Sequence, residues 1–393
     1  MAKIIAMYFP QFHTIPENDR WWGKGFTDWV NVRKARPQFD GHEQPRVPLD
    51  GRYYDQSDPA TLRWQTDLAR AYGVHGFCHY HYWFEGKQLL NEPTDLMLDD
   101  KSIDFPFCLS WANETWSRKW DGQDHHILVR QTHIPEKGRW KRHFDYLIRA
   151  WTDERAICVD GRPVFIIYRP HHILNIDAML DYWREEARRR GLKGLYFIAQ
   201  KQYRYHDRNI LRSFDAVFQF NPFEAFYFQK QTDERPAGRF REKLRTLVPR
   251  SVKLRLNALK DRLFPKLIFH DYEQVWSEAV NIRPEPGITT YPGGFVDWDN
   301  TARYKNRAQV FRGASPERFE YWMRRLVGTM KTRQLPEDYI FLNAWNEWAE
   351  AAYLEPDEKN GYRYLRALKR AVSEASGGLD GIGEGLLQES GSV

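Results

Sequence analysis

Eight short runs of apolar, β-branched or aromatic residues recur along this chain, each followed by a polar loop and then a stretch with helical periodicity. Runs of this kind predict buried strands, and strands that alternate with helices predict a parallel sheet. The eight predicted strands cover residues 4–9, 76–83, 105–111, 164–168, 196–199, 216–220, 294–298 and 340–345. Eight repeats indicate an α/β protein with a closed (β/α)8 TIM barrel. An open doubly wound sheet fits less well, because no glycine-rich phosphate loop follows the first strand.

Several of the intervening helices have clear boundaries in the sequence. Asp58 followed by Pro59 is typical of an N-cap and a first helical residue, and Gly73 ends the same helix just before the second strand. The stretch 176–190 carries apolar residues at helical spacing and ends at a glycine, and the stretch 317–330 follows a Ser-Pro pair. These boundaries support the alternation of strands and helices.

The length of 393 residues fits a single barrel, because (β/α)8 barrels extend from about 200 to over 400 residues. We therefore predict one catalytic domain over residues 1–376. The chain is 42% hydrophobic and 28% charged, which is enough for a large core and a solvated surface. The glycine- and serine-rich tail 377–393 is predicted to be disordered.

A strongly basic segment interrupts the pattern after the sixth strand. Residues 235–266 contain 11 Lys and Arg but 2 acidic residues, so their net charge of +9 exceeds the +6 of the whole chain. Apolar residues recur in it at roughly helical spacing, which predicts a helical insertion. One interpretation is a pair of solvated helices that lie against the barrel. The other is a basic face that binds an anionic membrane surface or an anionic glycan.

Composition argues against several classes of protein. No apolar run approaches the roughly 20 residues needed to cross a bilayer, and the apolar run at the start is too short for a signal peptide. The three cysteines are widely spaced, so neither a disulfide framework nor a zinc finger is predicted. No Gly-x-Ser-x-Gly elbow is present, so no nucleophilic triad is predicted. No Walker or dinucleotide motif is present, and no cofactor is predicted. Because the basic excess is confined to one segment, we predict no nucleic-acid partner. The cysteine pattern fits a reducing compartment, so we expect a cytoplasmic protein that is free or peripheral to the inner face of the membrane.

The predicted strand ends carry many aromatic side chains next to amides, carboxylates or guanidinium groups. In a (β/α)8 barrel the C-terminal ends of the strands form the functional face. Aromatic rings pack on the apolar faces of sugars while planar polar groups pair with hydroxyls, so this pattern predicts a site for an oligosaccharide or polysaccharide. A tryptophan-rich core is the alternative explanation for the 16 tryptophans of the chain. The predicted substrate-binding residues are Tyr8, His79, His81, Trp83, Trp111, Asn113, Glu114, Trp116, Tyr168, Gln200, Asp297, Trp298, Asp299, Trp345, Asn346 and Trp348.

Two glutamates, Glu347 and Glu350, follow the last predicted strand and are flanked by tryptophans. Two carboxyl groups in one crowded site cannot both ionise easily, so the pKa of one should rise relative to the other. One group can then donate a proton while the other accepts one, which is what cleavage of a glycosidic bond needs. Glu347 and Glu350 are therefore the predicted catalytic residues. A helix cap or an ion pair with a nearby arginine is the alternative role for either glutamate.

Two further groups of residues compete with this interpretation. His79 and His81 lie two apart on a strand, so they project together, and with Asp297 they would supply enough ligands for zinc or iron. No third histidine falls at an obvious strand end, so no metal is predicted. Glu114, which follows Asn113, is the alternative catalytic acid, and otherwise it would bind a substrate hydroxyl.

Five segments of the chain, taken in order, resemble the WbsX family. They are MYFPQFH (7–13), FCLSWANE (107–114), GRPVF (161–165), VDWDN (296–300) and NAWNEWAE (343–350). That family is usually described as glycosyltransferases of surface-polysaccharide clusters. It is similar to glycoside hydrolase family 99, whose members are (β/α)8 barrels that act inside α-mannoside chains with retention of configuration. The resemblance runs from residue 3 to about residue 370.

The resemblance implies roles for the two glutamates. The Asn-Glu-Trp-x-Glu motif of family 99 matches residues 346–350. By that resemblance Glu347 is the base that deprotonates the sugar 2-hydroxyl, Glu350 is the acid that protonates the leaving group, and the intermediate is a 1,2-anhydro sugar. We therefore expect a retaining glycoside hydrolase or transglycosidase that acts on a surface polysaccharide of the mannan or O-antigen type. A sugar-nucleotide-dependent glycosyltransferase of polysaccharide biosynthesis and a non-catalytic glycan-binding barrel are the alternatives.

Overall fold

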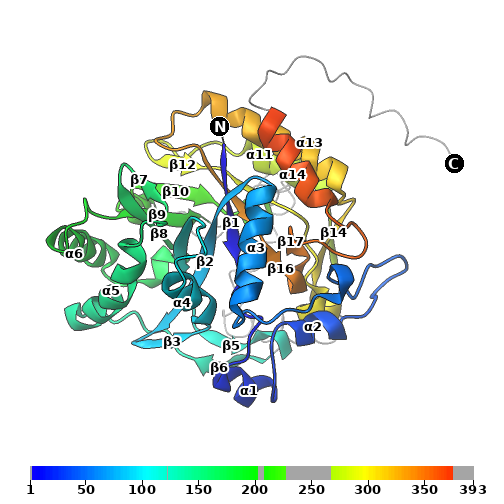
Figure 1. Ribbon diagram of the computed structural model, residues 1–393, viewed down its shortest axis with the longest axis horizontal. Helices are drawn as coiled ribbons and strands as arrows, with labels where there is room; N and C mark the ends of the chain where they lie inside the picture. The colour runs from blue at the N-terminus through cyan, green and yellow to red at the C-terminus, as the bar shows by residue number, and fades with distance from the viewer. Residues whose placement is uncertain (1, 122, 202–207, 227–266, 375–393) are drawn as a thin grey trace, which may run out of the picture.

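The computed structural model describes residues 2–121, 123–201, 208–226 and 267–374 (Figure 1). Within these residues a mostly parallel sheet closes into a barrel, which confirms the predicted (β/α)8 fold. Its strands are β1 (Lys3–Tyr8), β2 (Val74–Phe84), β4 (Phe107–Trp111), β8 (Arg162–Ile167), β9 (Tyr196–Lys201), β10 (Ala216–Gln219), β12 with β13 (Thr289–Tyr291 and Gly293–Phe295) and β15 (Tyr339–Asn343). Neighbours along this series pair in parallel, and β15 pairs with β1.

The seventh barrel strand is built in two pieces. Its first piece, β12, pairs with β10, and its second piece, β13, pairs with β15, while Pro292 between them has no N–H to offer a ladder. A Cβ atom on Gly293 would lie 1.9 Å from the carbonyl oxygen of Gln219, so glycine alone fits this close approach. The predicted boundaries 294–298 are wrong, because residues 296–298 form the loop after β13.

Alternate residues of each strand point into the barrel or towards the surrounding helices. On β1, Ile5 and Met7 belong to the cluster of side chains that fills the barrel, whereas Ala6 and Tyr8 belong to the layer between the barrel and the helices. Tryptophans contribute much of this packing, in line with the alternative explanation for their number. The largest fully buried side chains include Trp183, Trp276, Trp345 and Trp348.

The longer helices cover the outside of the barrel. They are α3 (Pro59–Ala71), α4 (Glu92–Asp99), α5 (Lys137–Trp151), α6 (Ile176–Arg189), α11 (Tyr272–Asn281), α13 (Pro316–Thr329) and α14 (Arg363–Glu374). In Figure 1, α5 and α6 lie at the left, whereas α11, α13 and α14 form a group at the top. The predicted N-caps of α3 and α13 are confirmed: the Asp58 carboxylate accepts a hydrogen bond from the N–H of Ala60 at 2.9 Å, and Ser315 accepts one from the N–H of Arg318 at 3.3 Å.

Shorter elements lie in the loops at the two ends of the barrel and beside it. They are α1 (Pro16–Trp22), α2 (Trp29–Lys34), η1 (Leu49–Gly51), β3 (Lys87–Leu89), β5 (Trp116–Arg118), η2 (Lys119–Asp121), β6 (Gln123–Val129), β7 (Cys158–Val159), η3 (Pro170–His172), α7 (Arg208–Leu211), β11 (Ile268–Asp271), α12 (Thr301–Tyr304), η4 (Lys305–Arg307), β14 (Gln309–Arg312), η5 (Met330–Thr332), β16 (Asn346–Glu347), η6 (Trp348–Glu350) and β17 (Ala352–Tyr353). Those that follow β1, β4, β13 and β15 gather at the C-terminal ends of the strands, where the functional face of such a barrel lies.

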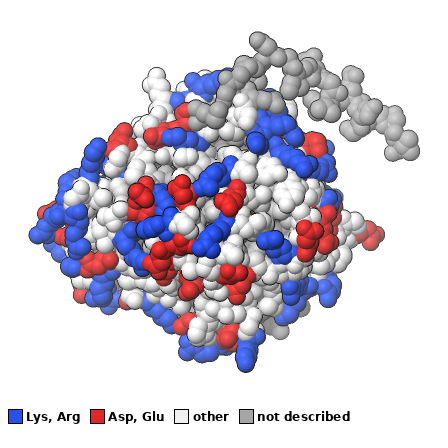
Figure 2. Space-filling view, in the orientation of Figure 1, with Lys and Arg blue, Asp and Glu red and all other residues white. Residues whose placement is uncertain are grey.

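Lys and Arg side chains are interspersed with Asp and Glu over the face of the molecule shown in Figure 2. The basic segment 235–266 and the tail 377–393 lie outside the described residues, so the helical insertion, its membrane contact and the disorder of the tail stay predictions. Among the residues that are described, no helix combines the length and the apolar character needed to span a bilayer.

Candidate active site

Glu347 and Glu350 lie just past β15, at the C-terminal end of the barrel. The chain leaves β15, pairs with β17 through β16 and then turns through η6, which brings the two carboxyl groups to the same side. Both glutamates line a cavity of about 450 Å³, which we call the central cavity. Its other lining residues are Tyr80, Tyr82, Ala112, Glu114, Trp116, Lys119, Tyr168, Arg169, Phe220, Phe223, Trp298, Asn300, Arg303, Tyr304, Arg307, Gln309 and Asn343.

A single guanidinium group joins the two glutamates. Arg303, on α12, donates from Nη1 to Glu350 Oε1 at 2.6 Å and from Nη2 to Glu347 Oε2 at 3.1 Å. Its Nη2 also donates to Oδ2 of Asp28, just before α2, at 2.7 Å. The Glu350 side chain is the most exposed of the four, at 19%. Solvent therefore screens these ion pairs much less than it would screen pairs on the surface.

The charges in this cluster do not balance, because one cation faces three carboxyl groups. Burial is the largest influence on Glu347 and raises its pKa from 4.5 to about 8; Arg303 opposes the rise, whereas Glu350 and Asp28 add to it. Burial also raises the pKa of Glu350. The pair therefore retains a proton near neutral pH. The shorter contact of Arg303 with Glu350 favours Glu350 as the ionised partner and Glu347 as the protonated one.

Aromatic rings enclose the Arg303 guanidinium. Its Cζ lies 5.1 Å from the centre of the Phe9 ring and 5.2 Å from the centre of the Trp120 ring. At these distances the rings attract the cation and replace part of its lost hydration. Arg303 is thus fixed by three carboxyl groups and by two rings.

Asn346 and Trp348 hold the loop that carries the glutamates and do not line the central cavity. Asn346 Oδ1 accepts a hydrogen bond from the N–H of Phe9 at 2.7 Å, and its Nδ2 donates to the Phe9 carbonyl at 3.0 Å. Trp348 Nε1 donates to Glu355 Oε2 at 2.6 Å, and the Tyr54 hydroxyl donates to the same oxygen at 2.8 Å. Burial raises the pKa of Glu355 to about 7. These predicted binding residues therefore position the loop that carries Glu347 and Glu350.

The second strand presents the opposite face from the predicted one. Residues two apart do project together, but it is Tyr80 and Tyr82 that line the central cavity. His79 lies 3.3 Å from a threonine of α4, His81 makes a 2.8 Å hydrogen bond to α5, and Trp83 stacks on a ring of α5. The structure thus places these three predicted binding residues against the helices.

Four predicted binding residues do line the central cavity, namely Glu114, Trp116, Tyr168 and Trp298. Glu114 Oε1 accepts a hydrogen bond from Arg169 Nε at 2.9 Å, and its side chain is 29% exposed. Glu114 is therefore more exposed than Glu347 or Glu350, and it pairs with a different arginine.

The remaining predicted binding residues lie away from the central cavity. Tyr8, Trp111 and Trp345 pack between the barrel and the helices, where the Tyr8 hydroxyl donates to Gln65 at 2.7 Å. Gln200, on β9, is buried and is not among the lining residues.

Asn113 lies in the loop after β4 and fixes its shape. Its Oδ1 accepts from the N–H of Arg169 at 2.7 Å, and its Nδ2 donates to the Arg169 carbonyl at 2.9 Å. The side chain therefore joins the loops that follow two neighbouring strands.

Asp297 and Asp299 face a second cavity of about 320 Å³, on the other side of their loop. Asp297 accepts a hydrogen bond from Arg46 at 3.1 Å. His79 and His81 face the helices, so the structure separates the three side chains of the alternative metal site. Within the described part of the chain, no group of three or more His, Cys, Asp and Glu side chains is arranged to hold a metal ion.

Sequence reasoning missed Arg303, Asp28, Tyr80 and Tyr82. The sequence did offer a reason to consider Tyr80 and Tyr82, because a strand with aromatic residues on both faces can present either face to the site. For Arg303, on the short helix α12, and Asp28, just before α2, it offered no such reason, because nothing in the neighbouring sequence marks either one as buried.

Several solved structures share this fold, including the following two. The GH99 endo-alpha-mannosidase from Bacteroides thetaiotaomicron, in complex with BIS-TRIS-Propane, aligns with a TM-score of 0.54 and 13% identity over 95% of this chain and 97% of its own. A glycoside hydrolase-like protein aligns with a TM-score of 0.56 and 13% identity over 94% of this chain and 93% of its own. At this level of identity the similarity establishes the barrel fold.

Sequence relatives extend the comparison. The uncharacterized protein WxcX from two strains of Xanthomonas campestris pv. campestris is 36% identical over 376 residues, or 95% of this chain. The chain spans about half the length of these relatives, since the match covers 50% of each. Residues 4–368 match the family described as Glycosyltransferase WbsX. The chain therefore belongs to the WbsX family.

Proposed function

We propose that this protein is a retaining glycoside hydrolase or transglycosidase that acts on a surface polysaccharide of the mannan or O-antigen type. The observation that carries the proposal is the pair of buried glutamates, Glu347 and Glu350, joined by Arg303 at the functional end of a (β/α)8 barrel. Membership of the WbsX family and a fold shared with a GH99 endo-alpha-mannosidase support chemistry at a glycosidic bond.

The walls of the central cavity suit a sugar. Aromatic surface comes from Tyr80, Tyr82, Trp116 and Trp298. Polar groups, such as the Asn300 amide and the guanidinium group of Arg303, line the same cavity. Rings that pack on the apolar faces of a pyranose, with polar groups that pair with its hydroxyls, are how proteins recognise such ligands. The cavity therefore supports an oligosaccharide as the ligand.

In each half of the proposed reaction, one glutamate accepts a proton and the other donates one. Glu347 removes the proton of the sugar 2-hydroxyl, and the freed oxygen attacks the anomeric carbon while the glycosidic C–O bond breaks. Glu350 gives its proton to the departing oxygen, so charge and atoms balance. In the second half, Glu350 takes a proton from water or from a sugar hydroxyl, whose oxygen opens the 1,2-anhydro ring, and Glu347 returns the proton to the 2-oxygen. Retention of configuration follows from the two successive inversions.

In the ligand-free site the shared proton lies on Glu347, whereas the proposed acid is Glu350. Arg303 makes its shorter contact with Glu350, so the proton resides on Glu347. The proposed roles need Glu350 protonated and Glu347 ionised. The proposed reaction therefore requires that substrate binding moves the proton from Glu347 to Glu350.

Product analysis by mass spectrometry tests the proposal. The purified protein, treated with EDTA, is incubated with a panel of α-mannan and O-antigen-type oligosaccharides, with and without sugar nucleotides. Shorter oligosaccharides without any nucleotide, or rearranged chain lengths if transfer dominates, are expected for the native protein and not for Glu350→Gln. Exposed Glu358 is the matched control, because Glu358→Gln makes the same chemical change away from the cavity.

The family description favours a second candidate, a sugar-nucleotide-dependent glycosyltransferase. That enzyme would lengthen acceptors when a sugar nucleotide and a divalent metal are restored, and it would do nothing without them. Such a result would overturn the hydrolase proposal and leave Glu347 and Glu350 with binding roles. Binding without any turnover, unchanged in Glu350→Gln, would instead indicate a glycan-binding barrel.

A further inference from the structure

A second, smaller cavity lies beside the central cavity, between α1 and the β5–β6 hairpin, and we call it the side cavity. Its volume is about 160 Å³, or roughly five water molecules at about 30 Å³ each, so it has room for one ring-sized group. The described residues that line it are Phe9, Gln11, Asn18, Trp22, Tyr82, Glu114, Thr115, Trp116, Ser117, Lys119, Trp120, Leu128 and Arg303. None of them carries a role in the proposed reaction except Arg303.

The two cavities adjoin each other. Five residues line both of them: Tyr82, Glu114, Trp116, Lys119 and Arg303. A chain of sugars that reaches Glu347 and Glu350 in the central cavity can therefore continue into the side cavity without leaving the protein surface.

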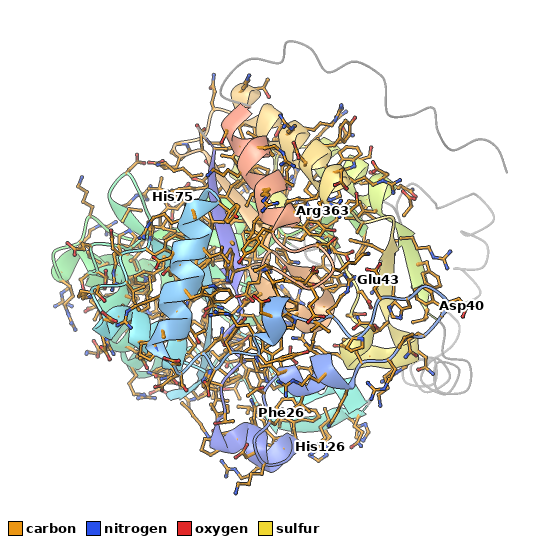
Figure 3. The ribbon with its side chains drawn as sticks, turned by 45° about the vertical axis from the view of Figure 1, so that its right-hand side comes forward. Phe26, Asp40, Glu43, His75, His126 and Arg363 are labelled. Carbon is orange, nitrogen blue, oxygen red and sulfur yellow. The ribbon has the colours of Figure 1, made fainter. Side chains whose placement is uncertain are left out.

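The aromatic wall of the side cavity is contributed by segments far apart in the sequence. Trp22, at the end of α1, stacks on Trp120 of η2 with ring centres 5.1 Å apart. Phe26 packs behind both rings, at 5.8 Å from Trp22 and 6.2 Å from Trp120. In Figure 3 the labelled Phe26 and His126, the latter on β6, lie at the same end of the molecule. This wall offers apolar surface of the kind on which a sugar ring packs.

Two polar side chains in the same cavity lack partners. Asn18 of α1 is 0% exposed, yet neither its Nδ2 nor its Oδ1 has a hydrogen-bond partner within the described residues. The Oγ of Ser117, on β5, is likewise buried without a partner there. A buried polar group without a partner costs about 1–3 kcal/mol, so an amide and a hydroxyl left in this state beside a cavity point to a ligand that completes them.

We propose that the side cavity is a sugar-binding subsite, in which the Asn18 amide and the Ser117 hydroxyl pair with hydroxyls of one ring and the aromatic wall contacts its apolar face. An amide that donates from nitrogen and accepts at oxygen matches two neighbouring hydroxyls. The inference rests on the proposed function for the identity of the ligand as a glycan. It adds a length requirement: the favoured substrate fills both cavities.

Binding measured without turnover tests the subsite. Glu350→Gln serves as the parent, and isothermal titration gives Kd for α-mannan oligosaccharides of two to six sugars and O-antigen oligosaccharides of one to three repeats. We expect Kd to fall once the ligand is long enough to enter the side cavity. Asn18→Leu should then weaken binding of the long ligands about 5- to 30-fold, and Ser117→Ala about 3- to 10-fold, with short ligands unchanged.

Loss of fold does not explain such a result, because both substitutions remove a buried group that has no partner and should not lower the melting temperature. Ser110→Ala is the matched control, since the Ser110 hydroxyl is also buried without a partner within the described residues but lines neither cavity. Equal affinity of parent, Asn18→Leu and Ser117→Ala for the long ligands overturns the subsite, as does failure of the parent to bind any ligand of the panel.

Turnover by the native protein separates the two proposals. Length-dependent binding that Asn18→Leu abolishes, without any cleavage or transfer, keeps the subsite and overturns the proposed function. Cleavage or transfer that is insensitive to Asn18→Leu and Ser117→Ala at every chain length keeps the proposed function and overturns the subsite.

Discussion

Replacement of Glu347 by glutamine should stabilise the protein, and the gain should grow with pH. Glu347 is 7% exposed and shares the single cation of Arg303 with Glu350 and Asp28. Ionisation of all three carboxyl groups would leave an excess of negative charge in a buried site, which costs free energy. Glutamine has nearly the shape of glutamate, keeps an oxygen for Arg303 and carries no charge.

The size of the effect follows from the pKa of Glu347, which burial raises from 4.5 to about 8. Below pH 4.5 the folded and unfolded chains both carry the proton, so the variant gains nothing. Between pH 4.5 and 8 the unfolded chain ionises while the folded protein keeps the proton, so stability is lost as pH rises through this range. At about 1.36 kcal/mol for each tenfold change in proton affinity, the upper limit is about 5 kcal/mol, and with Glu350 sharing the proton we expect roughly 2–5 kcal/mol at pH 8.

Urea denaturation followed by tryptophan fluorescence at pH 5, 6.5 and 8 measures this gain. Glu347→Gln should lie within about 1 kcal/mol of the native protein at pH 5 and unfold at higher urea concentration at pH 8. Glu358→Gln, an exposed change of the same kind, should match it at every pH. The electrostatic reasoning would be refuted if the difference in unfolding free energy between Glu347→Gln and the native protein stayed constant with pH, or if the variant were less stable at pH 8.

Three further predictions concern activity, the loop that carries Glu347 and Glu350, and acid stability. Glu350→Gln should lower the rate on unactivated glycosides about 10²–10⁴-fold but spare aryl glycosides with good leaving groups; an equal loss on both, in steady-state assays, would move the acid role elsewhere. Asn346→Ala should cost about 1–3 kcal/mol by leaving the buried N–H of Phe9 unpaired, and an unchanged melting temperature in scanning fluorimetry would count against that role. His81 and His143 share a 2.8 Å hydrogen bond, and burial lowers the pKa of His81 to about 3, so stability present above pH 6.5 should be lost as pH falls towards 3. His81→Gln should reduce the loss of unfolding free energy between pH 6.5 and 3, as measured by urea denaturation. An unchanged dependence on pH would contradict the role given to His81.

The barrel could be predicted because its signal is local and repeated. Each strand is a short apolar run, and proline, glycine and capping residues such as Asp58 and Ser315 mark the helices between them. The seventh strand was the exception for a physical reason. Its two pieces flank Pro292, so periodicity alone favours the aromatic run that follows and places the strand too far along the chain.

The candidate site could be predicted in part. Glu347 and Glu350 could be selected because functional residues of a (β/α)8 barrel lie at the C-terminal ends of its strands, and these two follow the last strand. The face of β2 could not be chosen in this way. His79 and His81 carry the more obvious chemistry, yet Tyr80 and Tyr82 line the central cavity, because the histidines find partners on α4 and α5 that the sequence of β2 does not reveal.

The cation of the site could not be predicted, and it changes the meaning of the glutamates. Arg303 and Asp28 lie 275 positions apart and meet only when the loops after the first and seventh strands close over the barrel. An ion pair with an arginine is the ordinary structural role for a buried glutamate, and the structure does show that contact. Here, however, one guanidinium touches both acids, so it can stabilise one negative charge while the other group keeps a proton. The contact that would argue against catalysis for one glutamate gives the pair unequal protonation, which the proposed reaction reverses when substrate binds.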